Sequence, residues 1–169
     1  MAGTGRSRRT ASAAPARPVL SPAVAAAVLT ALAPRELRLT PHRRAVLAVL
    51  EASGRPLTAD EVVHSSGVPT STAYRNLSEL AEAGVVARVA GAVGASGDRF
   101  ELAEPFSHRH HHHLVCTECG VVTDFDPSGE LERLIEREVS ELLATSGFEI
   151  THHVFDAHGR CRDCRTSSR

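Results

Sequence analysis

The sequence contains no lysine and no tryptophan, and its 169 residues include only one tyrosine and one methionine. Aromatic residues make up 4% of the chain, so a hydrophobic core has to be aliphatic, and the apolar fraction of 42% is sufficient to build one. No run of eighteen apolar residues occurs, which excludes a transmembrane helix. The N-terminal segment lacks the features of a signal peptide, so we expect a cytoplasmic protein with no membrane partner.

Because lysine is absent, all 19 basic residues are arginines, and they are unevenly distributed. Residues 1–90 hold 11 arginines and 6 acidic residues, a net charge of +5, whereas residues 91–169 hold 8 arginines and 14 acidic residues, a net charge of −6. This asymmetry favours an N-terminal half that approaches a polyanion and a C-terminal half that binds cations.

Cysteine occurs only four times, as two Cys-x-x-Cys pairs separated by 41 residues. The pairs are Cys116 with Cys119 and Cys161 with Cys164. In a reducing compartment, two such pairs supply the four thiolates that a tetrahedral structural zinc site requires. Redox-active disulfides are the alternative, because thiols at this spacing can have a lowered pKa.

The first half of the chain contains a series of helix starts. Residues 1–20 show no periodicity and are expected to form a disordered arm. Helices are then predicted to begin after Ser21, after Thr40 and after Thr58, where Glu61 completes a capping box. The short helices and the tight turn before the last of them predict a helix-turn-helix.

The helix after Gly67 is expected to enter the major groove of DNA. Its apolar residues recur at helical spacing and should face the core, whereas the polar residues near its N-terminus have side chains suited to base edges and phosphates. The predicted DNA-binding residues are Ser71, Thr72, Tyr74, Arg75 and Asn76. A protein-contact role for this helix, with Tyr74 partly in the core, is the alternative.

Two strand-forming runs, 85–89 and 99–102, flank a glycine-rich turn and predict the hairpin of a winged helix. The second half then reads as strand, cysteine turn, strand, amphipathic helix and a third strand over residues 148–164. We therefore expect an α+β chain with a winged helix-turn-helix domain followed by a small α/β dimerisation domain. The expected boundaries are an arm over 1–20, a winged-helix DNA-binding domain over 21–104, a hinge over 105–109 and a metal-binding dimerisation domain over 110–169.

The amphipathic helix "SGELERLIEREVSELLATSG" carries one apolar stripe that is expected to be buried. The stripe consists of Leu131, Leu134, Ile135, Val139, Leu142 and Leu143. Because the β-β-α-β unit is small and leaves a sheet edge to cover, we expect a homodimer that shares sheet or helix surface.

In this order, the segments "TAYRNLSELAEAGVV", "RFEL", "HHHHLVCTECG", "GFEITHHVF" and "GRCRDC" resemble the ferric-uptake-regulator (Fur) family of bacterial metal-responsive repressors. The resemblance covers about residues 38–164 and leaves out the arm and the first helix. It implies a homodimer that binds a pseudo-palindromic double-stranded DNA operator when metal at the hinge closes the dimer. It also implies that the four cysteines hold a structural zinc ion.

Successive side chains of a strand point to opposite faces, so the histidine run can contribute to two sites. The resemblance implies that one face serves a regulatory hinge site and that the other joins a glutamate of the long helix and a histidine of the last strand. The expected hinge ligands are Glu101, His108, His111 and His113. The expected second-site ligands are His110, His112, Glu132 and His153, with Glu136 and Glu130 as alternatives to Glu132.

Two departures from the family pattern leave the regulatory metal open. Phe106 stands where related zinc-uptake regulators often have a cysteine, and "SGRPLTADE" lacks the histidine of iron-type members. His108 is the candidate replacement ligand. We expect Zn²⁺ or Fe²⁺, with Mn²⁺ and Ni²⁺ as alternatives. The alternative is that the run is a cluster of surface histidines that binds no metal. The remaining histidines (His42, His64, His152 and His158) are expected to be structural or exposed.

These features predict a metal-dependent repressor and not an enzyme. The main alternative is a peroxide- or redox-sensing repressor on the same fold, which uses Fe²⁺ or Mn²⁺ and is oxidised at His111 or His113. A third hypothesis is an enzyme that uses a hydrated metal as a Lewis acid. No nucleophile–base pair or substrate-pocket signature accompanies the ligands, which argues against it.

Overall fold

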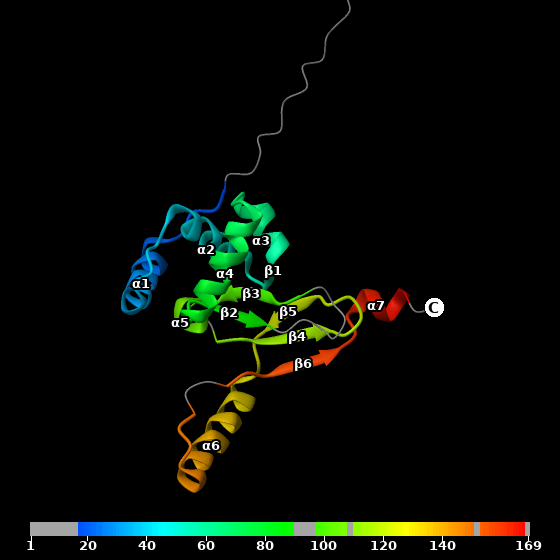
Figure 1. Ribbon diagram of the computed structural model, residues 1–169. Helices are drawn as coiled ribbons and strands as arrows, with labels where there is room; N and C mark the ends of the chain where they lie inside the picture. The colour runs from blue at the N-terminus through cyan, green and yellow to red at the C-terminus, as the bar shows by residue number, and fades with distance from the viewer. Residues whose placement is uncertain (1–16, 90–96, 108–109, 151–152, 168–169) are drawn as a thin grey trace, which may run out of the picture.

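The computed structural model describes residues 17–89, 97–107, 110–150 and 153–167. Helices α1–α4 gather at one end of the molecule against a first three-stranded sheet, and a second three-stranded sheet lies beside the first (Figure 1). Helix α6 projects from the second sheet. The α+β class predicted from the sequence is confirmed. No helix in the described ranges is long and apolar enough to span a membrane.

The helices of the first unit begin and end where their capping residues lie. Thr40 and Thr58 accept hydrogen bonds from backbone N–H groups of the first turn, and the Glu61 carboxylate accepts one from the backbone N–H of Thr58, which completes the capping box. Gly54 and Gly67 end their helices with positive φ angles. The elements are α1 (Pro22–Leu32), η1 (Ala33–Arg35), α2 (Pro41–Ser53), α3 (Ala59–Ser66) and α4 (Thr70–Glu82).

The core of the first unit is aliphatic, as the composition requires. Its central side chains come from each of the four α-helices of the unit and include Val28, Leu32, Val46, Leu47, Val62, Leu77 and Leu80. Phe100 and Phe106 are the aromatic residues of this core within the described ranges. A buried Arg43 pairs with Glu79 and thereby joins α2 to α4.

The first sheet forms the wing and has the order β1-β3-β2, with all neighbours antiparallel. Its strands are β1 (Leu57–Thr58), β2 (Val86–Val89) and β3 (Arg99–Leu102). The hairpin of β2 and β3 agrees with the prediction. Strand β1 was not predicted, because two residues are too short to show a period.

The second sheet has the order β5-β4-β6, with β5 antiparallel and β6 parallel to β4. The elements of this unit are α5 (Glu104–Ser107), β4 (His112–Cys116), β5 (Val122–Phe125), α6 (Gly129–Ser146), β6 (Asp156–Gly159) and α7 (Arg162–Ser167). The third strand is shorter than predicted. It begins at Asp156, which pairs with His113 near the start of β4, and the described residues 153–155 before it are not part of a strand.

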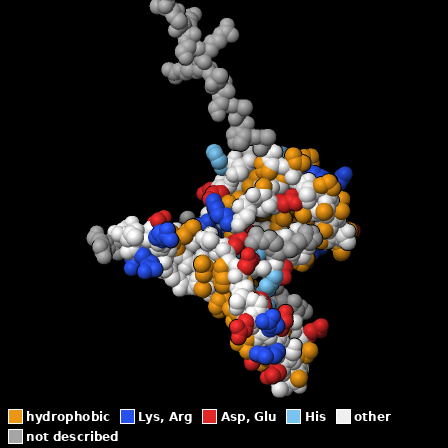
Figure 2. Space-filling view, turned by 180° about the vertical axis from the view of Figure 1, so that it is seen from behind, with side chains coloured by type: hydrophobic (Ala, Val, Ile, Leu, Met, Phe, Trp, Pro, Cys, Tyr) orange, Lys and Arg blue, Asp and Glu red, His pale blue; other side chains and the backbone are white. Residues whose placement is uncertain are grey.

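The expectation that the apolar stripe of α6 is buried is wrong for the single chain. None of its residues is buried, and Leu134, Leu142 and Leu143 are 44–50% exposed. The reason is topological, because no other described element of the chain covers this helix (Figure 1). In the space-filling view, mixed acidic and basic side chains cover much of the projecting part of the molecule, and apolar side chains are exposed near its base (Figure 2).

Candidate metal sites and nucleic-acid interface

The four cysteines come together at one end of the second sheet. Parallel pairing of β4 with β6 places Cys116 opposite Gly159, so the two Cys-x-x-Cys segments meet. Their four Sγ atoms lie within 4.8 Å of one another, and Cys119 Sγ is 3.7 Å from Cys161 Sγ. All four are free thiols, and this separation matches the edge of about 3.8 Å expected for a tetrahedron with zinc–sulfur bonds of about 2.3 Å.

Backbone N–H groups stabilise the ionised form of one of these thiols, Cys116. The N–H groups of Cys119, Cys161 and Glu118 point at Cys116 Sγ and lower the pKa of this thiol to about 6. By contrast, the side chains of Cys161 and Cys119 raise the pKa of Cys164. Four thiols this close together cannot all lose their protons unless a positive charge offsets the repulsion between the thiolates, so the cluster suits a divalent metal ion.

A second cluster joins the two units of the chain. Glu101 comes from β3 of the wing, His113 from β4, His111 from the residue just before β4, and Asp124 from β5. His111 Nε2 lies 3.2 Å from a Glu101 oxygen and 3.8 Å from Asp124 Oδ2, and His113 Nε2 lies 3.3 Å from the other Glu101 oxygen. We call these four residues the hinge cluster.

Asp124 was missed by the sequence reasoning. It lies directly opposite His113 in the antiparallel pairing of β4 with β5. The register of that pairing was not predictable, although an aspartate in a strand next to a histidine-rich strand was a signal that could have been weighed. His108, which was expected among the hinge ligands, lies outside the described residues.

The hinge cluster is held by strong electrostatic contacts. Burial alone would raise the pKa of Glu101, but hydrogen bonds and charge from His113 and His111 lower it. Burial alone would lower the pKa of His113, but Glu101 and then Asp156 raise it. Asp156 Oδ1 lies 3.1 Å from His113 Nδ1. Because a carboxylate only accepts, Nδ1 carries the proton in this hydrogen bond and Nε2 faces the cluster.

The third group lies on the opposite face of the histidine run and is called the helix cluster. It consists of His110, His112, His153 and Glu132 of α6. The Glu132 carboxylate is central, at 2.8 Å from His112 Nε2, 3.3 Å from His110 Nε2 and 3.7 Å from His153 Nε2. Its pKa is lowered, first by the hydrogen bond from His112. Glu130 and Glu136, the two alternatives, line a separate surface of α6.

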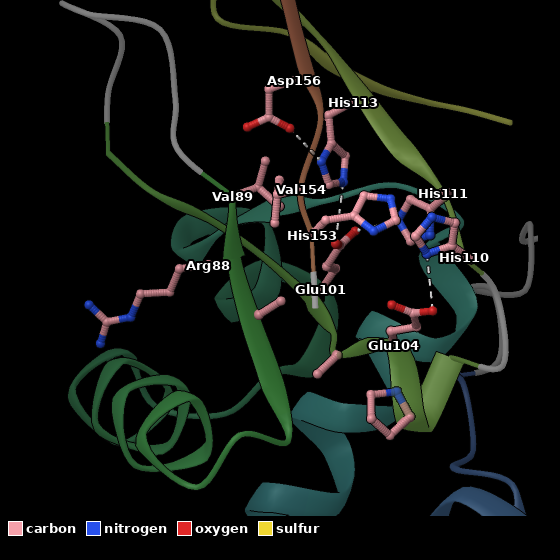
Figure 3. Close-up of a pocket in the computed structure, with 13 residues that line it drawn as sticks. Arg88, Val89, Glu101, Glu104, His110, His111, His113, His153, Val154 and Asp156 are labelled. Atoms are coloured by element: carbon pink, nitrogen blue, oxygen red, sulfur yellow. Dashed lines mark hydrogen bonds and ion pairs between the residues drawn. The ribbon is translucent and has the colours of Figure 1, made fainter. Parts of the chain in front are cut away.

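A cavity of about 710 Å³ lies beside both histidine clusters (Figure 3). His110 and His153 reach it from the helix cluster, and Glu101, His111 and His113 reach it from the hinge cluster. The view also shows Glu104 bonded to His110, at 3.0 Å from its Nδ1. The structure thus places successive histidines of the run in different clusters.

The donor sets fit divalent metal ions. Nε2 of His110 and Nε2 of His113 are both buried, and each lies 3.3 Å from a carboxylate oxygen, of Glu132 and of Glu101 respectively. The ligand atoms of each cluster lie within 4.8 Å of one another, and their contacts of 2.8–3.8 Å bracket the edge of about 3.4 Å for a tetrahedron with metal–nitrogen bonds of about 2.1 Å. Mixed imidazole and carboxylate ligands suit zinc, iron, manganese and nickel.

Helix α4 presents most of the residues expected to contact DNA. Ser71, Tyr74 and Arg75 are exposed, and Thr72 is partly exposed. Tyr74 donates a hydrogen bond to Asp60 Oδ1 at 2.9 Å and is 48% exposed, so it lies outside the core. Asn76 departs from the prediction: it is only 4% exposed and faces inward with the apolar stripe of α4, so it cannot reach a base edge in this structure.

Comparison with known proteins gives a consistent picture. The sequence profile described as the ferric uptake regulator family matches residues 34–158. The peroxide-responsive repressor PerR of Staphylococcus saprophyticus is 31% identical over 144 residues, in a match that covers 81% of this chain and 88% of that protein.

Solved structures with similar folds include two ferric uptake regulators. The Pseudomonas aeruginosa protein with manganese has a TM-score of 0.61 and 28% identity, covering 79% of this chain and 97% of that one. The Vibrio cholerae protein, whose structure reveals a rearrangement of its DNA-binding domains, has a TM-score of 0.57 and 29% identity, covering 78% of this chain and 98% of that one.

Proposed function

This chain belongs to the ferric uptake regulator family and is a metal-dependent repressor, and we propose that it acts as a homodimer on a pseudo-palindromic DNA operator when its regulatory metal is bound. The observation that carries the proposal is the hinge cluster, because its ligand atoms come from both units of the chain. Residues 21–104 would form the DNA-binding domain, 105–109 the hinge and 110–169 the dimerisation domain.

Each cluster has a distinct proposed role. Cys116, Cys119, Cys161 and Cys164 would hold a structural zinc ion. The hinge cluster of Glu101, His111, His113 and Asp124 would hold the regulatory metal, with His108 as a candidate further ligand, and the helix cluster of His110, His112, Glu132 and His153 would hold a second metal. We infer that the regulatory ion is Zn²⁺ or Fe²⁺, with Mn²⁺ and Ni²⁺ as alternatives.

The proposed switch depends on differential affinity. Glu101 of the wing and His111, His113 and Asp124 of the second unit would hold a cation, whose charge would offset that of the two carboxylates. Because these ligands come together only when the wing lies against the second sheet, binding would favour that arrangement and raise its population. In a symmetric dimer, this arrangement would present both α4 helices to successive major grooves of one operator.

The proposed DNA contacts are on the exposed N-terminal part of α4. Arg75 can donate two hydrogen bonds to a guanine, and the hydroxyl groups of Ser71, Thr72 and Tyr74 can contact phosphates or base edges. The related Vibrio cholerae regulator has DNA-binding domains by its own description. Because a repressor must reach the chromosome, we propose that this protein is cytoplasmic. We propose no enzymatic activity for it.

Peroxide sensing is a second candidate function with its own support. The Staphylococcus saprophyticus relative is a peroxide-responsive repressor. In this chain the hinge cluster offers two imidazoles and two carboxylates, a harder donor set than cysteine would give and one that suits Fe²⁺ and Mn²⁺. Mass spectrometry of the Fe²⁺-loaded protein after peroxide treatment decides this point. A gain of one oxygen atom on His111 or His113, absent with Mn²⁺, would support sensing.

The main proposal is tested by operator binding at buffered free concentrations of Zn²⁺, Fe²⁺, Mn²⁺ and Ni²⁺, using duplex DNA selected from a random pool. We expect one or more of these metals to tighten binding by at least about tenfold, in line with typical coupling between sites. Asp124→Ala should raise the metal concentration required for half-maximal binding by roughly 10- to 100-fold, because a ligand is lost.

The matched control is His158→Ala, since His158 is exposed and belongs to none of the three clusters. It should leave the metal response unchanged. Operator binding by the wild type that is equally tight with and without every metal would overturn the proposed function.

A further inference from the structure

Strand β3 faces two of the candidate metal sites with one side. Phe100 and Leu102 point into the core of the winged-helix unit, where they are 9% and 4% exposed. The alternate residues, Arg99 and Glu101, share the other side of the strand. Glu101 enters the hinge cluster, whereas Arg99 extends to the cysteine site.

Arg99 donates a hydrogen bond from Nε to the backbone carbonyl of Gly120, at 3.0 Å. Gly120 follows Cys119, is buried and has a φ of +70°, and its N–H group donates back to the Cys116 carbonyl at 3.0 Å. The accepting carbonyl therefore belongs to the turn that carries the first two cysteines. The Arg99 side chain is only 14% exposed, so water competes little for this bond.

Apolar packing reinforces the same contact. Val89 is the cross-strand partner of Arg99 in the wing hairpin. It packs with Val115 and Val122 of the second sheet in a small core separate from the main one. The wing thus contacts the cysteine turn through Arg99 and the two strands that flank this turn through Val89.

The guanidinium group of Arg99 also forms an ion pair with the helix-turn-helix. Its Nη1 lies 3.7 Å from a carboxylate oxygen of Glu61, the residue that closes the capping box of α3. Arg55 holds the same carboxylate at 2.6 Å. A continuous set of polar contacts therefore runs from the cysteine turn through Arg99 to the N-terminus of α3.

We propose that Arg99 is a positioning residue that makes the orientation of the winged-helix domain depend on the cysteine turn as well as on the hinge cluster. The four-cysteine site then has a regulatory consequence beyond stabilising its own domain. Once the turn loses its shape, the Gly120 carbonyl moves away from Arg99 and the wing loses its support. This inference rests on the proposed function, since its readout is metal-dependent operator binding.

The test compares Arg99→Met with Arg88→Met in the full-length, zinc-replete protein. Arg88 is the matched control because it lies in the same hairpin and loses the same charge, but its contacts to Ser78 and Asp98 stay within the winged-helix unit. Figure 3 shows its side chain directed away from the hinge cluster. At saturating regulatory metal, Arg99→Met should weaken operator binding by roughly tenfold relative to Arg88→Met.

A second measurement separates positioning from loss of charge or stability. The radius of gyration of the metal-loaded dimer, from small-angle X-ray scattering, should increase for Arg99→Met and stay unchanged for Arg88→Met, while both keep the wild-type zinc content. Equal operator affinity and equal radius for the two variants would overturn the inference. Should Arg99→Met lose zinc, Arg99→Leu, which also lacks a hydrogen-bond donor, replaces it, and wild-type affinity and radius for that zinc-replete variant would also overturn the inference.

The two proposals fail in different ways. A wild-type protein whose operator binding ignores metal contradicts the proposed function. A wild type that responds to metal, with an Arg99 variant that behaves like the Arg88 variant, contradicts only the role of Arg99.

Discussion

His112 and His113 are adjacent in the sequence, yet their imidazoles belong to different clusters. Both side chains are buried, and each faces carboxylates from its own set of elements: Glu132 of α6 for His112, and Glu101 of β3 with Asp156 of β6 for His113. A substitution at one histidine should therefore affect one site without removing the donors of the other.

The ionisation of His113 predicts how regulatory metal affinity depends on pH. Its pKa is raised above 6.5 in the metal-free protein, where Glu101 and Asp156 outweigh the effect of burial. A metal ion can bind His113 only after the protonated imidazole has lost a proton, so the affinity for the metal should fall as the pH decreases. The fall should begin above pH 6.5 and approach about tenfold per pH unit below the pKa of His113. Above the pKa of His113 this contribution should level off.

Chelator competition between pH 6 and pH 8 measures this effect. Asp156→Asn removes one of the carboxylates that raise the pKa of His113, so the onset should move to lower pH in that variant. Metal affinity that does not change over this range would contradict the assignment of His113 as a ligand.

At the scale of elements, helix α4 separates residues that its sequence places together. Arg75 is exposed, whereas its neighbour Asn76 is buried and its Nδ2 has no hydrogen-bond partner among the described residues. Arg75→Ala should weaken operator binding roughly 5- to 150-fold at fixed salt, the loss expected for about 1–3 kcal/mol of base readout. Asn76→Leu should keep operator affinity within about twofold, because no base contact is lost.

Gel-shift titration and thermal unfolding of both variants check this prediction. Asn76→Leu should not lower the melting temperature, since it replaces an unsatisfied buried amide by an apolar side chain of similar size. An Asn76→Leu variant that folds normally but fails to bind the operator would restore Asn76 to the DNA interface.

At the scale of the whole molecule, α6 needs a partner. Its apolar stripe is half-exposed in the single chain, and the part of the chain that the structure describes has nothing else to cover it. We expect the second copy of the chain to bury it. Leu142→Asp should therefore shift the protein toward monomers and weaken operator binding, because two α4 helices are no longer linked.

Sedimentation velocity at micromolar protein concentration measures the shift. Ser140→Asp is the control, since Ser140 lies on the exposed polar surface of the same helix and receives the same charge. A Leu142→Asp protein that sediments as a dimer would place the interface elsewhere, for instance at the edge of the second sheet.

The sequence by itself determined the features that depend on residues close together in the chain. Capping at Thr40 and Thr58 needs only neighbours within one helical turn, and the separation of His111 and His113 from His110 and His112 follows from strand geometry. The spacing within each cysteine pair likewise indicates metal ligands, because two thiolates of one short turn can bind the same ion.

Only the tertiary structure decided the features that depend on strand register and on packing between distant segments. Asp124 joins the hinge cluster because β5 pairs with β4 in one particular register, and Arg99 meets Gly120 because the wing packs on the second sheet. Asn76 faces the core because of the orientation in which α4 packs against the neighbouring elements. No local pattern specifies these arrangements, since a shift of one residue in register would change every partner.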